Sequence, residues 1–154
     1  MKRFIQHFIV IVILCCMASC NGGEVYYKFK PIPNHQWVRG QEIIFLLDSA
    51  SISSNVNYNV SIEITHNIGY QYKNLFLLFD YTQDSTVVHD TVQCLLVDNH
   101  GRWIGNGNGA TRQLSVPYKA NFRIDTALHN KISIRHAMQR QNLKGIEKIG
   151  LKIY

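Results

Sequence analysis

The residue with the most definite chemistry is Cys20, which follows a short apolar segment and two small residues. A cysteine at the first position of a processed secretory protein can carry diacylglycerol on its thiol. The segment before it has the parts of a secretory signal: a positive start at Lys2 and Arg3, an apolar run over 8–14 and a small-residue exit. That run is far shorter than the roughly 20 apolar residues that cross a bilayer. We therefore expect residues 1–19 to be a lipoprotein signal peptide and Cys20 to be the site of lipid attachment.

The four residues Met17-Ala18-Ser19-Cys20 resemble a bacterial lipobox, with methionine in place of the usual leucine. The alternatives are an ordinary cleaved signal or an uncleaved single anchor. Two or more acyl chains hold a protein firmly on a membrane, at about 0.8 kcal/mol per buried methylene. Residues 20–30 would then form a lipidated N-terminus and tether. Asn21-Gly22-Gly23-Glu24 lacks a strong acidic signal for surface export, which favours a periplasm-facing position on the cell membrane or outer membrane.

Charge and cysteine content exclude several other classes of protein. Without the signal, the 154-residue chain keeps 14 basic and 10 acidic side chains, a formal net charge of +4. The basic residues are spread out, whereas a nucleic-acid site needs a dense patch, so we expect no nucleic-acid partner. Once Cys20 carries lipid, Cys94 is left alone among apolar neighbours and is expected to be buried and inert.

The sequence shows no catalytic or metal-binding set. A hydrolase needs a nucleophile with a base, or a pair of carboxylates, but turn chemistry and solvation explain Asp80, Asp84 and Asp90. The histidines lie far apart, without the close pair that zinc sites usually show. Asp98 and Asn106 could offer oxygen ligands but lack the spacing of a calcium loop. We therefore expect no enzymatic activity, no metal and no cofactor.

A glycine-rich stretch over 98–109 contains the best candidates for contact with a partner or ligand. Its four glycines within nine positions exclude a comfortable helix. Trp103 could stack on a sugar ring or a peptide group, or it could pack beneath the loop, which we favour. Arg102 and Asn106 lie beside it as further candidate contacts. Trp37 is the remaining candidate, although we expect it to anchor against the core.

The elements that must position these residues are strands. Strand patterns recur at 25–29, 41–48, 58–66, 75–81, 87–97, 114–124, 131–135 and 146–154. The stretch 41–48 is apolar on both faces, whereas 58–66 alternates and predicts one wet face. Pro117 favours an edge strand, and 136–143 is the one stretch that favours a short helix. We predict an all-β fold: an antiparallel, jelly-roll-like β-sandwich over 31–154, with a short helix near the C-terminus.

Several short motifs follow one another in a characteristic order along the chain. They are the lipobox at Cys20, Ile32-Pro33-Asn34 before Trp37, Tyr72-Lys73-Asn74-Leu75-Phe76-Leu77, Asp98 through Gly105, and Ile134 through Ile153. In this order they resemble the gliding motility lipoprotein family GldH of the Bacteroidota, and the C-terminal segment is the most specific part. The stretch 105–110 departs from the family in its richness in Gly-Asn.

The resemblance implies a membrane-anchored component of the gliding machinery, which works alongside other Gld lipoproteins and the associated protein-export system. It supplies no catalytic residues. It also does not require that the host glides, because non-gliding bacteria have members of the family too. We therefore expect a non-enzymatic docking protein. Its partners would be the membrane, through the lipid on Cys20, and other envelope lipoproteins or proteins of the gliding and export machinery. The alternative is a lipoprotein whose β-sandwich binds carbohydrate through Trp37 and Trp103.

Overall fold

The computed structural model describes residues 23–83, 85–127 and 130–154, so the expected signal peptide and Cys20 lie outside the described residues. No helix in the described ranges is long and apolar enough to cross a membrane. Strands account for most of the fold. They are β1 (Tyr26–Pro31), β2 (Gln36–Val38), β3 (Ile43–Leu46), β4 (Asn57–Asn67), β5 (Asn74–Gln83), β6 (Thr86–Leu95), β7 (Thr111–Arg123), β8 (Lys131–His136), β9 (Asn142–Lys144) and β10 (Ile146–Ile153).

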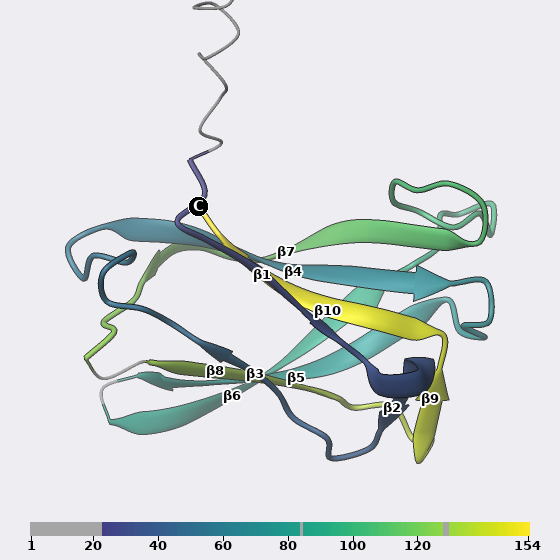
Figure 1. The fold of residues 1–154 in the computed structure, drawn as a ribbon, viewed down its shortest axis with the longest axis horizontal. Coiled ribbons are helices and arrows are strands. Elements are labelled where there is room, and N and C mark those ends of the chain that lie inside the picture. Colours follow the sequence, from purple (N-terminus) through teal and green to yellow (C-terminus); the bar gives the residue numbers. More distant parts are fainter. Residues whose placement is uncertain (1–22, 84, 128–129) are drawn as a thin grey trace, which may run out of the picture.

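The strands form one long hairpin that is rolled into a sandwich. Its two arms pair β1 with β10, β2 with β9, β3 with β8, β4 with β7 and β5 with β6, all antiparallel. Rolling adds the pairs β4–β10 and β5–β8. Two four-stranded sheets result, β1-β10-β4-β7 (sheet I) and β3-β8-β5-β6 (sheet II). They form the upper and lower layers of Figure 1, which confirms the predicted antiparallel sandwich of jelly-roll type.

The core lies between the two sheets because alternate residues of each strand point inward. Ile62 and Ile64 of sheet I and Leu77 and Phe79 of sheet II are fully buried there. Burial of each such side chain contributes about 1.5–3 kcal/mol. Cys94 is also fully buried, and burial raises the pKa of its thiol to about 12. The predicted burial of Cys94 as a small core residue is confirmed.

The helix predicted over 136–143 is wrong. His136 ends β8, and residues 142–144 form β9, which pairs with β2. Helix propensity is a weak preference that tertiary contacts override, and here the segment joins two strands that already have partners. Within the described ranges, the helical structure is a single 3-10 turn at Pro33–His35 (η1).

Two strands show the reverse of the exposure that their patterns predict. The apolar stretch 41–48 contains β3, an edge strand, whose Ile44 and Leu46 are 39% and 65% exposed. The alternating stretch 58–66 forms β4, which is buried on both faces, including Ser61 and Glu63. The cause is position in the sheet, because an edge strand lacks one neighbour and a central strand has two.

The N-terminal part of the described chain already belongs to sheet I. Residues 26–30, expected both as the end of a tether and as part of an extended strand, lie in β1 and pair with β10. Tyr26 is opposite Ile153, so the described chain begins beside its C-terminus, as Figure 1 shows.

Candidate functional site

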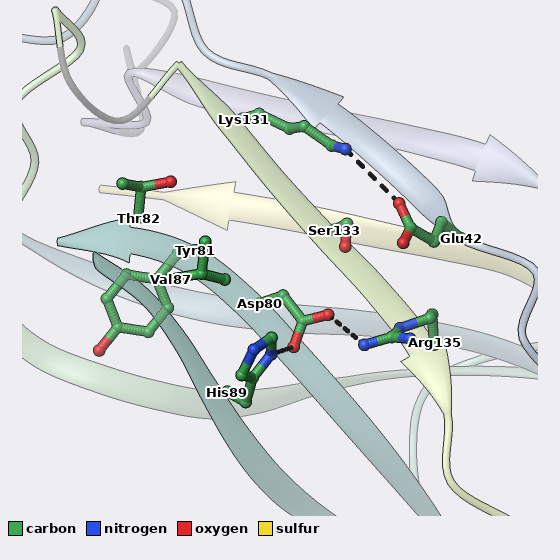
Figure 2. Close-up of a pocket in the computed structure, with 9 residues that line it drawn as sticks. All are labelled: Glu42, Asp80, Tyr81, Thr82, Val87, His89, Lys131, Ser133 and Arg135. Atoms are coloured by element: carbon green, nitrogen blue, oxygen red, sulfur yellow. Dashed lines mark hydrogen bonds and ion pairs between the residues drawn. The ribbon is translucent and has the colours of Figure 1, made fainter. Parts of the chain in front are cut away.

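The outer face of sheet II carries a polar hollow of about 230 Å³, drawn in Figure 2. The cross-strand register creates it, because Ser133, Asp80 and His89 lie opposite one another on β8, β5 and β6. Opposite residues of neighbouring strands share one face of a sheet. The side chains that line the hollow are Glu42, Asp80, Tyr81, Thr82, Val87, His89, Lys131, Ser133 and Arg135.

Asp80 is the centre of this hollow and is only 8% exposed. Its Oδ2 accepts a hydrogen bond from Arg135 Nη2 at 2.5 Å, and its Oδ1 lies 2.7 Å from His89 Nδ1. Hydrogen bonds between ionised partners are about twice as strong as neutral ones. Arg135 Nε is buried without a hydrogen-bond acceptor among the described residues. Asp80 therefore joins β5 to both neighbouring strands through their side chains.

The order of these side chains decides what chemistry they can perform. A serine nucleophile needs a histidine between itself and the carboxylate, so that the imidazole can take the hydroxyl proton. Here Asp80 lies between Ser133 on one neighbouring strand and His89 on the other. His89 therefore faces the carboxylate from the side opposite to the serine, and the three residues do not form a proton relay.

Apolar side chains also lie on this outer face. Besides Ile44 and Leu46, Val87 and Leu95 of β6 are exposed, at 54% and 58%. Lys131 and Glu42 form an ion pair at the rim, with Nζ and Oε2 3.5 Å apart. Exposed apolar residues around charged and polar groups are typical of surfaces that bind other proteins.

A second polar cluster joins the two sheets where β6 and β7 form their edges. Tyr118 of β7 donates a hydrogen bond to Asp90 of β6, and Lys119 Nζ lies 3.3 Å from the same carboxylate. The Tyr118 hydrogen bond lowers the pKa of Asp90 below its usual range, whereas burial raises the pKa of Tyr118 itself. The alternation in 114–124 places Tyr118 toward the core, but its partner Asp90 gave no signal in the sequence.

The four predicted contact residues do not form one site. Trp37 is fully buried, and its indole N–H donates to the Gln41 carbonyl at 3.1 Å. It therefore has no exposed face on which a ligand could stack, and the expected anchor against the core is present.

Trp103, Arg102 and Asn106 lie together on the glycine-rich loop. Trp103 is half-buried and its ring packs against buried His66, with ring centroids 4.8 Å apart. This agrees with the interpretation that Trp103 stabilises the loop. Arg102 is exposed and pairs with Asp98 at 2.8 Å, and exposed Asn106 forms a β-bridge with Gln113.

Across the described residues, no three His, Cys, Asp or Glu side chains converge on a point that could hold a metal ion. The polar hollow on sheet II was missed from the sequence because Asp80 and Arg135 are 55 positions apart. The sequence did contain one indication of the hollow: Asp80 lies inside the apolar stretch 75–81, and a buried acid needs a polar partner.

Comparisons with known proteins cover nearly the whole chain. The family model described as GldH lipoprotein matches residues 24–153. A protein from Christiangramia forsetii named "Gliding motility lipoprotein GldH homolog" is 30% identical, over 99% of this chain and 97% of the relative. A Flavobacterium johnsoniae protein named "Gliding motility lipoprotein GldH" is 23% identical, over 94% and 93% of the two chains.

Proposed function

Because the chain belongs to the GldH lipoprotein family, we propose that it is a lipid-anchored, non-enzymatic protein that docks partner proteins of the cell envelope. The lipid is carried by Cys20 and holds the domain on the cell membrane or outer membrane, facing the periplasm. The partners are other envelope lipoproteins or proteins of the gliding and export machinery. The names of both relatives describe gliding motility lipoproteins, which supports this assignment.

The docking surface in this proposal is the outer face of sheet II. The observation that carries it is the combination of exposed Ile44, Leu46 and Val87 with the polar hollow around Asp80. Burial of apolar surface is the main favourable contribution to protein association, and the charged groups of the hollow supply specificity. The charges are mixed rather than of one sign, which favours a protein partner over an anionic polymer.

Two further observations support a role in binding rather than catalysis. The carboxylate of Asp80 is occupied by Arg135 and His89, and Ser133 lies on the wrong side of it for a relay. The carbohydrate-binding alternative has less support, because Trp37 is buried and Trp103 packs against His66. Glycan binding through these two indoles would need at least one free ring face.

Substitutions on the two exposed apolar positions Leu46 and Ile68 test the docking surface. Leu46 is 65% exposed on sheet II, and Ile68 is 68% exposed in the turn between β4 and β5. We expect Leu46→Glu to lower the recovery of cross-linked envelope proteins from intact cells at least ten-fold, and Ile68→Glu to leave it unchanged. Both variants should keep the wild-type circular dichroism spectrum. Equal recovery with Leu46→Glu and Ile68→Glu contradicts the assignment of this surface.

The lipid anchor has its own test in the full-length protein. Cells grown with radiolabelled palmitate should label the wild-type chain and leave Cys20→Ala unlabelled. Cys20→Ala should also move from the membrane fraction to the soluble fraction. Equal labelling of both proteins would contradict lipid attachment at Cys20, independently of the result for the docking surface.

A further inference from the structure

The edge strands of the two sheets differ in how their free edges are protected. β1 carries Lys28 and Lys30 and ends in Pro31, and β3 has only four residues. β7 contains Pro117 and two register shifts against β4. Lysine, proline, bulges and short length all prevent an edge from pairing with another chain.

β6 is the fourth edge strand and has none of these features. It is ten residues long, contains neither lysine nor proline, and pairs with β5 without a register shift. No other strand in the described ranges pairs with its free side. Asp90, an inward-pointing charge of the kind that can also protect an edge, is already paired with Tyr118 and Lys119 of β7. A long, regular edge is a ready template for a further strand.

The hydrogen bonds of the ladder identify which groups on β6 are free. Leu96 N–H donates to the Lys73 carbonyl at 2.9 Å, and this pair continues the β5–β6 register. Backbone groups along an antiparallel strand point alternately to one neighbour and to the other. The even-numbered residues of β6 therefore bond to β5, and the odd-numbered residues point their N–H and C=O outward, toward the free edge of the sheet. The outward groups belong to Val87, His89, Thr91, Gln93 and Leu95.

We propose that β6 pairs antiparallel with β6 of a second copy of this chain, about a two-fold axis at Thr91. In this register Thr91 faces Thr91, His89 faces Gln93, and Val87 faces Leu95 of the second copy. All five outward residues then exchange backbone hydrogen bonds, about ten in total.

Side-chain chemistry selects this register over its neighbours. It is the register that brings exposed Val87 and exposed Leu95 of the two copies together, so that both lose contact with water. A shift of two residues would set Asp90 opposite Asp90 of the second copy, and directly opposed like charges destabilise a sheet. The opposite shift leaves Val87 without a partner.

The arrangement also suits two anchored chains. A two-fold axis between neighbouring strands of one continuous sheet is perpendicular to that sheet, so both copies of sheet I lie on the same side. β1, at the start of the described chain, belongs to sheet I (Figure 1). Both N-termini therefore leave on one side, as a common membrane requires; this one point rests on the proposed lipid anchor. The two outer faces of sheet II form one continuous surface on the other side.

Cysteine cross-linking of the full-length protein in native membranes tests the axis. Thr91→Cys places two thiols next to the two-fold axis, and Ser115→Cys is a matched control on exposed edge strand β7. After treatment with a short bismaleimide, we expect a product of twice the chain mass. It should be at least ten-fold more abundant for Thr91→Cys than for Ser115→Cys. Equal yields for the two variants, or no product for Thr91→Cys, would overturn the proposal.

Thr91→Pro tests the same pairing through the backbone. It removes an outward N–H that β5 does not use, and edge strands tolerate proline at such positions. Light scattering of the detergent-solubilised protein should give two chains per particle for wild type and one for Thr91→Pro, with unchanged circular dichroism. If Thr91→Pro does not fold, Leu95→Lys should give the same monomer. A monomeric wild type, or a dimer that survives in the folded variants, refutes the pairing and leaves the Leu46→Glu result to decide the docking function.

Discussion

The two sheets follow the same alternation toward the core, yet their outer faces differ at the edge strands β1 and β3. On sheet I, the ring of Phe29 packs against Gly150, and the side chain of Glu63 lies close to the same glycine. Ser61 and Glu63 of the central strand β4 are only 2% and 3% exposed. On sheet II, the outward residues Asp80 and Ser133 of the central strands are also buried, but Ile44 and Leu46 of the edge strand β3 remain exposed. The middle of each outer face is therefore covered, whereas the β3 edge of sheet II leaves aliphatic side chains open to solvent.

The edge strands explain this difference. β1 is six residues long and sends aromatic side chains outward, and Gly150 leaves room for one of them to lie flat on the sheet. β3 has four residues and carries short aliphatic side chains outward, which cannot reach across their neighbours. The length and outward residues of an edge strand thus decide which face is closed within the chain and which is available to a partner.

The largest expected effect comes from opening the closed face. A Cβ at Gly150 would lie 2.8 Å from the Phe29 ring and 2.9 Å from Glu63 Cβ. Gly150→Ala should therefore displace the ring and lower the free energy of unfolding by about 2 kcal/mol. Urea denaturation measures this. Ser115→Ala, in the same row of sheet I but exposed, should change the free energy of unfolding by less than about 0.5 kcal/mol. Equal effects would show that Phe29 does not close this face.

A smaller loss is expected from the polar hollow on the open face. Asp80→Asn replaces a nearly buried carboxylate that accepts from Arg135 and His89, which should cost about 1–2 kcal/mol. Glu42→Gln, in the more exposed pair with Lys131 at the rim, should cost at most about 0.5 kcal/mol. Thermal unfolding of both variants checks this. A loss for Glu42→Gln as large as that for Asp80→Asn would mean that burial does not strengthen the cluster.

The smallest effect is a pH dependence from one buried histidine on each sheet. Burial lowers the pKa of both His66 and His136, so the folded protein binds protons less readily than the unfolded chain. Stability is then complete above the ordinary histidine pKa of about 6.5 and declines as pH falls below it. The free energy of unfolding should be lower at pH 5.5 than at pH 7.5, and His66→Phe should reduce that difference. An unchanged difference would assign the effect to His136 or to other groups.

Much of the fold could be predicted from local patterns. The β5–β6 hairpin, the inward alternation of β7 and its position at an edge were all visible, the last because Pro117 lacks an N–H donor. The helix at 136–143 was wrong because a few helix-forming residues cannot outweigh the pairing of β9 with β2. The hollow around Asp80 was missed because its partners come from distant strands.

The sequence by itself determined the period-two strands, the burial of Cys94 and the membership of the GldH lipoprotein family, which the comparisons confirmed. It also marked Cys20 as the predicted lipid site. Only the tertiary structure decided that Glu63 is covered and that Leu46 is exposed. The physical reason is that alternation along one strand depends on neighbouring residues, whereas the covering of an outer face depends on which other strand lies beside it.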